Sequence, residues 1–294
     1  MKASEMASRM PTLLIRYGEL GLKSESVRRR FEQMLIQDMK RKHMLAQVPC
    51  VITSTRGRLY LDSDDWRRSC EILSKTFGVV SFSPVTKVSS DLEVLKKATV
   101  EFSAPLMVAD ARFAVRTRRT GNHSYTSQTL AEEIGSVLLS SFQDKHLKVS
   151  LDDPDVEVFV EVRDRHAYLY SSVLPGPGGM PKNTQGRILS VTDVTRSIAS
   201  SWLMMKRGCN VIAAVKDNCD IDALKIWDPD LKSVEYDRDL FALAQRHDCQ
   251  GITMPWMLDD LEDRKPPKGN LPVFYPLIGM NHDEVGALLS RITR

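Results

Sequence analysis

The junction at residues 188–208 constrains the fold of this chain more than any other feature. It is a buried, strand-like run followed at once by an apolar helix that ends at Gly208. An abrupt strand-to-helix turn is where nucleotide-binding α/β proteins hold phosphate, using glycines, hydroxyl groups and the free N–H groups of the helix start. This turn contains no glycine, carries the β-branched Val194 and places Asp193 where phosphate oxygens would lie. The architecture indicates a nucleotide enzyme, whereas the chemistry of the loop argues against one.

Two interpretations of this turn are open. In the first, its polar side chains still bind an anion. In the second, Asp193 caps the N-terminus of the helix, where a small acidic residue is stabilising and would repel a nucleotide triphosphate. We favour the second, with Trp202, Met204 and Met205 as core packing under the sheet. The loop residues concerned are Thr192, Asp193, Thr195, Arg196 and Ser197.

The composition, 42% hydrophobic and 27% charged residues, is that of an ordinary soluble protein. No stretch approaches the roughly 18 apolar residues of a membrane span, and the N-terminus lacks the apolar run of a signal peptide. We therefore expect a cytoplasmic protein without a membrane partner. Five scattered cysteines without a C-x-x-C pair predict neither a disulfide framework nor a zinc site, and we expect each to be a small buried hydrophobe. The histidines are equally scattered, so we expect no metal.

Positive and negative charges are concentrated in different parts of the chain. Residues 11–60 hold ten Lys/Arg against four Asp/Glu, whereas residues 217–263 hold four against thirteen. The formal net charge of +3 hides this asymmetry. A basic N-terminal part predicts a polyanionic partner, although two solvated surfaces would have the same composition. The acidic run at residues 259–263 is interpreted as exposed surface without a ligand.

A first domain is predicted over residues 11–88. Apolar residues at Val27, Phe31, Leu35 and Met39 have the i, i+4 spacing of an amphipathic helix. Strand-like runs flank this helix, and Pro84 predicts an edge position for the last of them. The order β-α-β-β-α-β is that of a ferredoxin-like unit. We expect strands at residues 12–17, 51–54, 58–62 and 79–88, and helices at residues 26–42 and 64–77.

A second domain is predicted over residues 89–174 and a third over residues 182–294. The second combines helices at 91–102 and 127–142 with strands at 112–118, 156–162 and 167–171. The Gly- and Pro-rich run at 175–181 marks a boundary, which we interpret as a rigid interdomain spacer. Beyond it strands alternate with helices, which predicts a parallel sheet with right-handed crossovers. The expected fold class is therefore α/β, with an α+β N-terminal half.

Six phrases of the sequence together resemble the tRNA 4-thiouridine synthetase (tRNA sulfurtransferase, ThiI-like) family. In chain order they are IRYGELGLKS, SFSPV, FAVRTRRTGNHSY, GPGGMPKNTQGRILS, WLMMKRG and PLIGMNHDEV. The resemblance implies a ferredoxin-like domain, a THUMP RNA-binding domain and a doubly wound PP-loop domain, which is the domain order predicted above. It is a resemblance to an archaeal-type member with a degenerate PP-loop.

The departures from the family pattern concern catalysis. Family members carry SGGxDS in the PP-loop, where this chain has TDVTRS. The segment that contains this motif is one residue shorter in this chain than in the family. The synthetases also carry a sulfur-bearing cysteine beyond the PP-loop core, and we expect that segment to be absent because the chain stops soon after PLIGMNHDEV. Cys249 matches an internal strand of the family rather than the catalytic loop. These departures predict no catalytic residue and no cofactor.

The residues best suited to bind RNA lie on the strand expected at 112–118 and in the loop after it. Arg116 and Arg118 share one face of it, and Arg119 opens a loop with an amide, an imidazole and a hydroxyl group. Guanidinium groups bind phosphate bidentately. Amide and aromatic groups next to them can stack on unpaired bases or form hydrogen bonds with them. The alternative interpretation is a strand face that is merely exposed to solvent. The resemblance implies contact with the tRNA acceptor end and its CCA. The candidate residues are Lys23, Arg28, Arg56, Arg58, Arg112, Arg116, Arg118, Arg119, Asn122 and His123.

The expected function is tRNA binding through the first two domains, without adenylation by the protein itself. The third domain would then be a scaffold or a surface for a partner, such as a tRNA-modification enzyme or a sulfur carrier. The family resemblance also suggests a homodimer. The alternative is an active ATP-dependent sulfurtransferase for tRNA 4-thiouridine or for the thiazole of thiamine, with ATP in an atypical loop. A third alternative is a vacated cleft that binds another metabolite.

Overall fold

The computed structural model describes residues 12–18, 24–55, 57–217 and 219–293. Their contacts group them into two compact units. The first unit combines the described residues up to Ile15 with Cys50–Trp66 and Phe82–Leu174. The second combines Arg16–Pro49 and Arg67–Ser81 with the chain from Pro175 onward.

The N-terminal part has the element order predicted from its sequence. Its strands run in the order β2-β3-β1-β4, with β1 and β2 both antiparallel to β3. Leu13 and Ile52 flank Leu61 in this register. The ferredoxin-like prediction is confirmed. The elements are β1 (Thr12–Tyr17), α1 (Glu25–Leu45), β2 (Cys50–Thr55), β3 (Arg58–Ser63), α2 (Trp66–Ser74) and β4 (Val79–Ser89).

The edge position predicted for β4 from Pro84 is wrong. β4 lies between β1 and β8 (His166–Tyr170) in the sheet. Its antiparallel pairing with β8 runs over Thr86–Ser89, beyond the proline, so the missing N–H of Pro84 interrupts no bond of that ladder. A strand of 11 residues can pair with different neighbours along different parts of its length. A single proline therefore does not place the whole strand at an edge.

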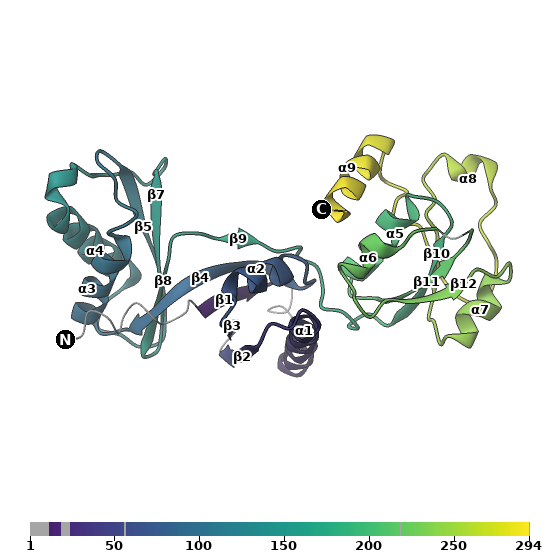
Figure 1. Cartoon of the computed structure of the whole chain (residues 1–294), viewed down its shortest axis with the longest axis horizontal. Helices are drawn as coiled ribbons and strands as arrows, with labels where there is room; N and C mark the ends of the chain where they lie inside the picture. The colour runs from purple at the N-terminus through teal and green to yellow at the C-terminus, as the bar shows by residue number, and fades with distance from the viewer. Residues whose placement is uncertain (1–11, 19–23, 56, 218, 294) are drawn as a thin grey trace. The chain divides into compact units, whose positions relative to one another are not determined.

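The following part adds four strands in the order β8-β7-β5-β6. Helices α3 and α4 cover one face of β5 and β7 (Figure 1) and share a core with them that includes Leu95, Phe113, Ile134 and Val160. Strand β5 is parallel to β7, and β7 is antiparallel to β8. The elements are α3 (Leu92–Ser103), β5 (Arg112–Thr120), α4 (Ser127–Ser141), β6 (Lys148–Val149) and β7 (Val156–Arg163).

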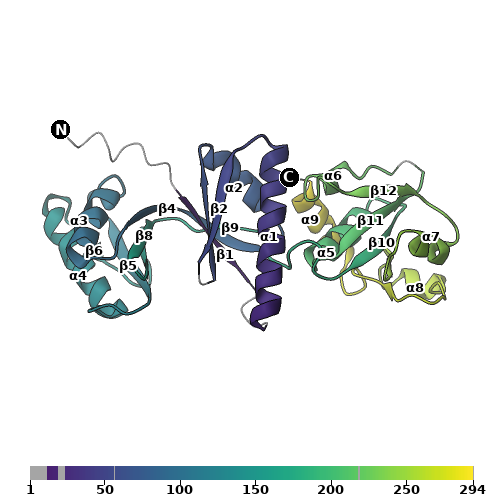
Figure 2. The same cartoon turned by 90° about the horizontal axis from the view of Figure 1, so that it is seen from below.

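A separate five-stranded sheet, parallel throughout, has the order β12-β11-β10-β13-β14. Helices α5, α6 and α9 lie against one face and α7 against the other (Figures 1 and 2). Side chains of β11 alternate accordingly, because Val211 faces α5 and Ile212 faces α7. The predicted parallel sheet is confirmed. The strands are β10 (Arg187–Thr192), β11 (Asn210–Val215), β12 (Lys232–Glu235), β13 (Ile252–Thr253) and β14 (Val273–Phe274). The helices are α5 (Ser197–Lys206), α6 (Asp222–Lys225), α7 (Leu240–Arg246), α8 (Asp260–Asp263) and α9 (His282–Ile292).

The Gly- and Pro-rich segment, interpreted from the sequence as a rigid spacer, is packed within the second unit. The amides of Gly176 and Gly178 donate to the carbonyls of Val80 and Val79 at 2.9 and 2.8 Å, and Met180 donates to Lys206 at 2.9 Å. A Cβ atom on Gly179, where φ is +76°, would lie 2.2 Å from the Lys206 carbonyl oxygen. Only glycine permits this approach, so the segment is fixed against β4 and the end of α5.

An aromatic cluster joins α2 to the parallel sheet inside the second unit. Phe77, just after α2, stacks on Trp227 with ring centroids 5.3 Å apart and meets Trp202 edge-on at 5.4 Å. All three side chains are at most 5% exposed. Trp202 and Met205 are thus core residues as predicted, whereas Met204 is only partly buried.

Candidate functional site

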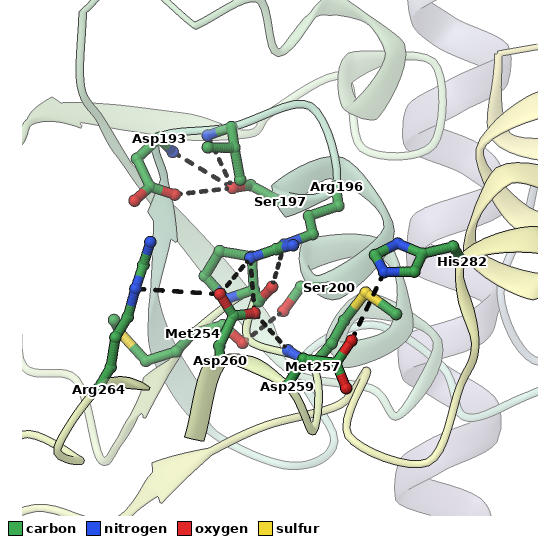
Figure 3. A network of polar contacts seen from close by, with 12 residues as sticks. Asp193, Arg196, Ser197, Ser200, Met254, Met257, Asp259, Asp260, Arg264 and His282 are labelled. Atoms are coloured by element: carbon green, nitrogen blue, oxygen red, sulfur yellow. Dashed lines mark hydrogen bonds and ion pairs between the residues drawn. The ribbon is translucent and has the colours of Figure 1, made fainter. Parts of the chain in front are cut away.

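The parallel sheet has a switch point between β10 and β13. These strands are neighbours, yet the chain adds β11 and β12 on one side and β14 on the other. Ligands of doubly wound sheets bind outside the carboxyl ends of the strands at such a point. The loop after Thr192 and the segment after Thr253 meet here, and Figure 3 shows their polar side chains converging. The five predicted loop residues therefore lie at the position where a ligand is expected.

The polar groups of the loop are bonded to one another. The Ser197 hydroxyl accepts from the amides of Asp193 and Val194 at 3.2 and 3.3 Å and donates to an Asp193 carboxylate oxygen at 3.2 Å (Figure 3). The amides of Ser197 and Ile198 donate to the carbonyls of Val194 and Thr195. A phosphate cradle needs such amides free and converging. In this loop they are used internally.

The predicted helix cap at Asp193 is wrong. Helix α5 begins at Ser197, its N-cap position is Arg196, and no side chain caps it. Asp193 lies three residues before that position and its carboxylate accepts from the Ser197 hydroxyl instead. The amides of Ser197 and Ile198 donate to the carbonyls of Val194 and Thr195, three residues earlier, so the chain turns tightly between Asp193 and the start of the helix.

Arg196 and Asp260 form an ion pair beside this loop. The guanidinium of Arg196 donates to both carboxylate oxygens at 2.8 and 2.6 Å and to the Pro255 carbonyl at 2.8 Å (Figure 3). The amide of Met257 donates to the same carboxylate at 2.9 Å. Burial opposes ionisation of Asp260, but the Met257 and Arg196 hydrogen bonds outweigh it and hold its pKa below the usual value.

This pair corrects one prediction from the sequence. Residues 259–263 were expected to be exposed acidic surface, yet the Asp260 side chain is only 12% exposed. Asp259 does conform to that expectation, since its side chain is 82% exposed beside His282. The cation of Arg196 is likewise used internally, which leaves the loop with less positive charge for an anion.

The surroundings of four cysteines raise the pKa of the thiol, which is the opposite of activation; they are Cys70, Cys209, Cys219 and Cys249. Cys249 is buried, and burial raises its pKa to about 11. Cys219 is partly exposed near the loop, 3.9 Å from the Val194 carbonyl; burial, then Asp193 and Asp220, raise its pKa. None of the five cysteines is in a disulfide, and Cys50, Cys70 and Cys219 are only partly buried, so the expected burial holds for two of the five. Among the described residues, no three His, Cys, Asp or Glu side chains gather as a metal site requires.

The candidate RNA face is the side of β5 that α4 does not cover. Phe113 packs toward the helices, so Arg116 and Arg118 emerge on the opposite face. Arg116 donates to Glu157 of β7 at 2.9 Å and to the Leu151 carbonyl. Arg118 is exposed, and its guanidinium has no ion-pair partner within the described ranges. The two arginines share a face, but only Arg118 has its charge available.

Two other predicted arginines are held in ion pairs. Arg112, at the start of β5, bonds to Asp153 and Asp155, which raises the pKa of Arg112 and lowers that of Asp155 to about 2. It lies roughly 20 Å along the strand from Arg118. Arg58 is 3.1 Å from Glu161, whose side chain is 2% exposed. Both cations therefore stabilise the sheet in this structure.

The loop after β5 places the remaining candidates of the first unit together. Arg119 donates to the Gly121 carbonyl at 3.0 Å, and Asn122 is exposed. A ring nitrogen of His123 lies 2.6 Å from the Asp164 carbonyl oxygen, and its ring stacks on Tyr125. The loop is thus anchored to the β7–β8 turn.

The other candidates lie elsewhere. Arg28 is partly exposed on α1 and belongs to the second unit. Lys23 and Arg56 lie outside the described residues.

The sequence did not reveal a polar hollow of about 270 Å³ on the first unit. Tyr60 and Tyr168 stack in it with centroids 4.7 Å apart, and Lys87, Arg163 and His166 line it. Burial, then Lys87 and Arg165, lower the pKa of His166. Lys87, Arg163 and His166 come from three different strands, so no local run of basic residues could have indicated this hollow.

Comparisons with known proteins agree with this architecture. Residues 12–83 match the ThiI ferredoxin-like domain and residues 89–172 match the THUMP domain. A probable tRNA sulfurtransferase of Methanobrevibacter smithii is 38% identical over 220 residues, 73% of this chain and 56% of that protein. The chain belongs to the THUMP-domain tRNA sulfurtransferase family.

Other members of the tRNA sulfurtransferase family are similar over the same part. The probable tRNA sulfurtransferase of Methanothermobacter thermautotrophicus is 36% identical over 70% of this chain and 52% of its own length. The chain therefore spans about half the length of the curated relatives that it matches.

Solved structures share the fold over nearly the whole chain. PH1313 of Pyrococcus horikoshii has a TM-score of 0.80 at 25% identity and covers 97% of this chain and 100% of its own. A 4-thiouridine synthetase–RNA complex with bound ATP has a TM-score of 0.74 at 19% identity, with 96% and 85% covered. The second likeness shows a common fold only. No described helix is long and apolar enough to cross a membrane.

Proposed function

We propose that this protein binds tRNA through its ferredoxin-like and THUMP domains and grips the acceptor end and its CCA with the THUMP domain. The single observation that carries this proposal is Arg118, an exposed guanidinium on the uncovered face of the THUMP sheet. Arg119, Asn122 and His123 follow it on an anchored loop. Phosphate contacts position an RNA, and amide or ring groups beside them suit unpaired nucleotides.

The proposal includes the absence of adenylation by this protein itself. Its support is the loop after β10, where the amides of Asp193 and Val194 donate to Ser197 and the cation of Arg196 is paired with Asp260. A nucleotide at the switch point would have to displace these bonds. The third domain then acts as a scaffold or as the surface for a modification enzyme or a sulfur carrier.

The alternative is an active ATP-dependent tRNA sulfurtransferase with an atypical nucleotide loop. The names of the relatives favour it, since both are called probable tRNA sulfurtransferases. This alternative requires release of pyrophosphate from ATP in the presence of tRNA. The control is Asp260→Ala, which disrupts the loop. If the unchanged protein released pyrophosphate faster than this control, the alternative would replace the proposal of an inactive loop.

The experiment that tests the proposal compares tRNA carrying an intact CCA with tRNA lacking that end, at two salt concentrations. We expect weaker binding without the CCA at both. Salt weakens phosphate contacts in both RNAs alike, so it does not imitate this difference. Equal affinity for the two RNAs would mean that the basic face is a general polyanion surface.

A further inference from the structure

A second surface, in the second unit, has features that the proposed function does not use. Two adjoining hollows of about 510 and 580 Å³ lie beside β14, the edge strand of the parallel sheet. They share Met180, Met204, Arg207 and Phe274 as lining residues, so we treat them as one groove. The groove lies near the amino ends of β10 and β11, away from the switch point, because Arg187 and Cys209 line it.

An exposed aromatic ring forms part of this groove. Phe274 is 43% exposed, although it ends a strand of the sheet. A Cβ atom on Gly251 would lie 2.7 Å from an edge carbon of this ring, so the ring rests directly on the glycine backbone. One edge of the ring therefore packs against the Gly251 backbone, while much of the side chain stays exposed to solvent. Such a platform suits a flat, unsaturated group.

The charge of the groove has one sign. Its charged lining residues are Lys206, Arg207 and Arg187, and neither hollow is lined by Asp or Glu. Within the described parts of the chain, Lys206 and Arg207 have no acidic partner, while Arg187 is 3.7 Å from an exposed Asp248. Burial, then the nearby Arg291, lower the pKa of Lys206. A lining with three cationic side chains and no carboxylate indicates an anionic occupant.

We propose that this groove binds an unpaired RNA segment, with one base stacked on Phe274 and its phosphates beside Lys206 and Arg207. Binding sites for single-stranded nucleic acid combine a basic groove with an aromatic platform. Each hollow is within the size range of small-ligand sites. An acidic peptide would also satisfy the cations, but it does not require an exposed flat ring. The proposal goes beyond the proposed function, because the THUMP residues lie in the other unit.

The probe is fluorescein-labelled hexauridylate, which has no secondary structure, titrated into the full chain. We expect Phe274→Ala to weaken binding about tenfold, the order expected for one lost stacking contact. Phe274→Tyr should bind as the unchanged protein does, because it keeps the ring. Arg207→Glu should weaken binding and reduce its salt dependence. Lys232→Glu, a matched reversal at an exposed residue of β12 outside the groove, should have no effect.

Ultraviolet cross-linking of the same probe, mapped by mass spectrometry, identifies the site directly. We expect cross-links at Phe274 or Tyr275 that Arg118→Ala retains. Unchanged affinity of Phe274→Ala, with cross-links confined to the THUMP domain, would overturn the groove and leave the proposed function intact. If Arg118→Ala bound tRNA as well as the unchanged protein does, and tRNA without its CCA bound as well as intact tRNA, only the proposed function would be contradicted. Displacement of the probe by a Glu-rich peptide, at lower concentration than by unlabelled RNA, would assign the groove to a protein partner.

Discussion

Arg118 differs from Arg112 and Arg116 of β5 in having no ion-pair partner among the described residues. Replacing it with alanine should weaken tRNA binding and lower the slope of log K against log salt by about 0.7–0.9, the effect of one phosphate contact. Binding titrations at four salt concentrations measure this slope. Lys97→Ala is the control, since Lys97 is exposed on α3, on the covered side of the same sheet. Equal slopes for the two variants would contradict a phosphate contact at Arg118.

His43 makes the stability of the second unit depend on pH. Its ring is 1% exposed; Nδ1 lies 2.8 Å from the Met39 carbonyl oxygen, and Nε2 has no hydrogen-bond partner among the described residues. Burial lowers the pKa of His43 from its usual value near 6.5, against the opposing hydrogen bond to Met39. The unfolded chain therefore binds a proton at a higher pH than the folded one does.

The free energy of unfolding should consequently be greatest above about pH 6.5 and fall as the pH drops toward the lower pKa of the folded state. Urea denaturation at pH 7.5 and 5.0 measures the loss. His43→Met removes the titrating group and keeps an apolar side chain, so its loss over this range should be smaller. Identical losses in the two proteins would assign the pH dependence to other groups.

The sequence could place a side chain on a strand face, but it could not show a partner that lies far away along the chain. The alternation in β5 placed Arg116 and Arg118 on one face because that pattern is local. It could not show that Arg116 is paired, since Glu157 is 41 residues further along the chain. The same holds for Arg196 and Asp260, which are 64 residues apart. Parallel pairing of β5 with β7, and of β10 with β13, decides both contacts.

At the scale of elements, helix α9 is fixed by its first turn. Asn281 accepts from the Glu284 amide at 2.9 Å, and its own amide donates to the Glu284 carboxylate at 2.8 Å, which forms a capping box. Asn281→Ala should lower the free energy of unfolding by about 1 kcal/mol. Tryptophan fluorescence during urea denaturation follows it, because the Trp227 indole donates to the Ile292 carbonyl at the end of α9.

Two variants of the same helix sharpen that measurement. Asn281→Asp keeps a side-chain acceptor at the cap and should retain most of the stability. Ser290→Ala removes an exposed hydroxyl bonded to Gly286 and should change the stability by less than about 0.5 kcal/mol. A loss at Ser290 as large as that at Asn281 would mean that the helix responds to any polar truncation.

Elements with strong periodicity were predicted to within a few residues, and short charged ones were not. β5 and α1 have alternating or i, i+4 apolar residues, which set the buried side, and β1 is a short apolar run. β12 reads Lys-Ser-Val-Glu and is mostly exposed, so it has no apolar pattern and was missed. It forms only because β11 offers it a parallel edge over residues 212–215. The role of Asp193 was also wrong, since the turn before α5 is set by the Ser197 hydroxyl.

At the scale of the molecule, the compact units do not follow the order of the chain. The second unit takes α1 and the region around α2 from the N-terminal part and joins them to the parallel sheet. Arg41 of α1 is 2.7 Å from Asp230, and Lys182 pairs with Asp228 in the same region. The Arg41–Asp230 pair is exposed and contributes little, whereas the Lys182–Asp228 pair is largely buried. The aromatic cluster of Phe77, Trp202 and Trp227 is the stronger connection, because it is fully buried.

Phe77→Ala should therefore destabilise a sheet that is more than 100 residues away in the sequence. Removing a buried phenylalanine costs about 3–5 kcal/mol, and the lost contacts are with Trp202 of α5 and with Trp227. Hydrogen exchange should become faster in β10 and β11, which α5 covers, and in α2. Phe102→Ala is the control, since Phe102 packs in the core of the first unit and should affect β5 and β7 instead. If exchange in Phe77→Ala became faster only in α2, α2 and the parallel sheet would open independently. The second unit would then be two domains in contact, and the groove beside β14 could be studied in the sheet alone.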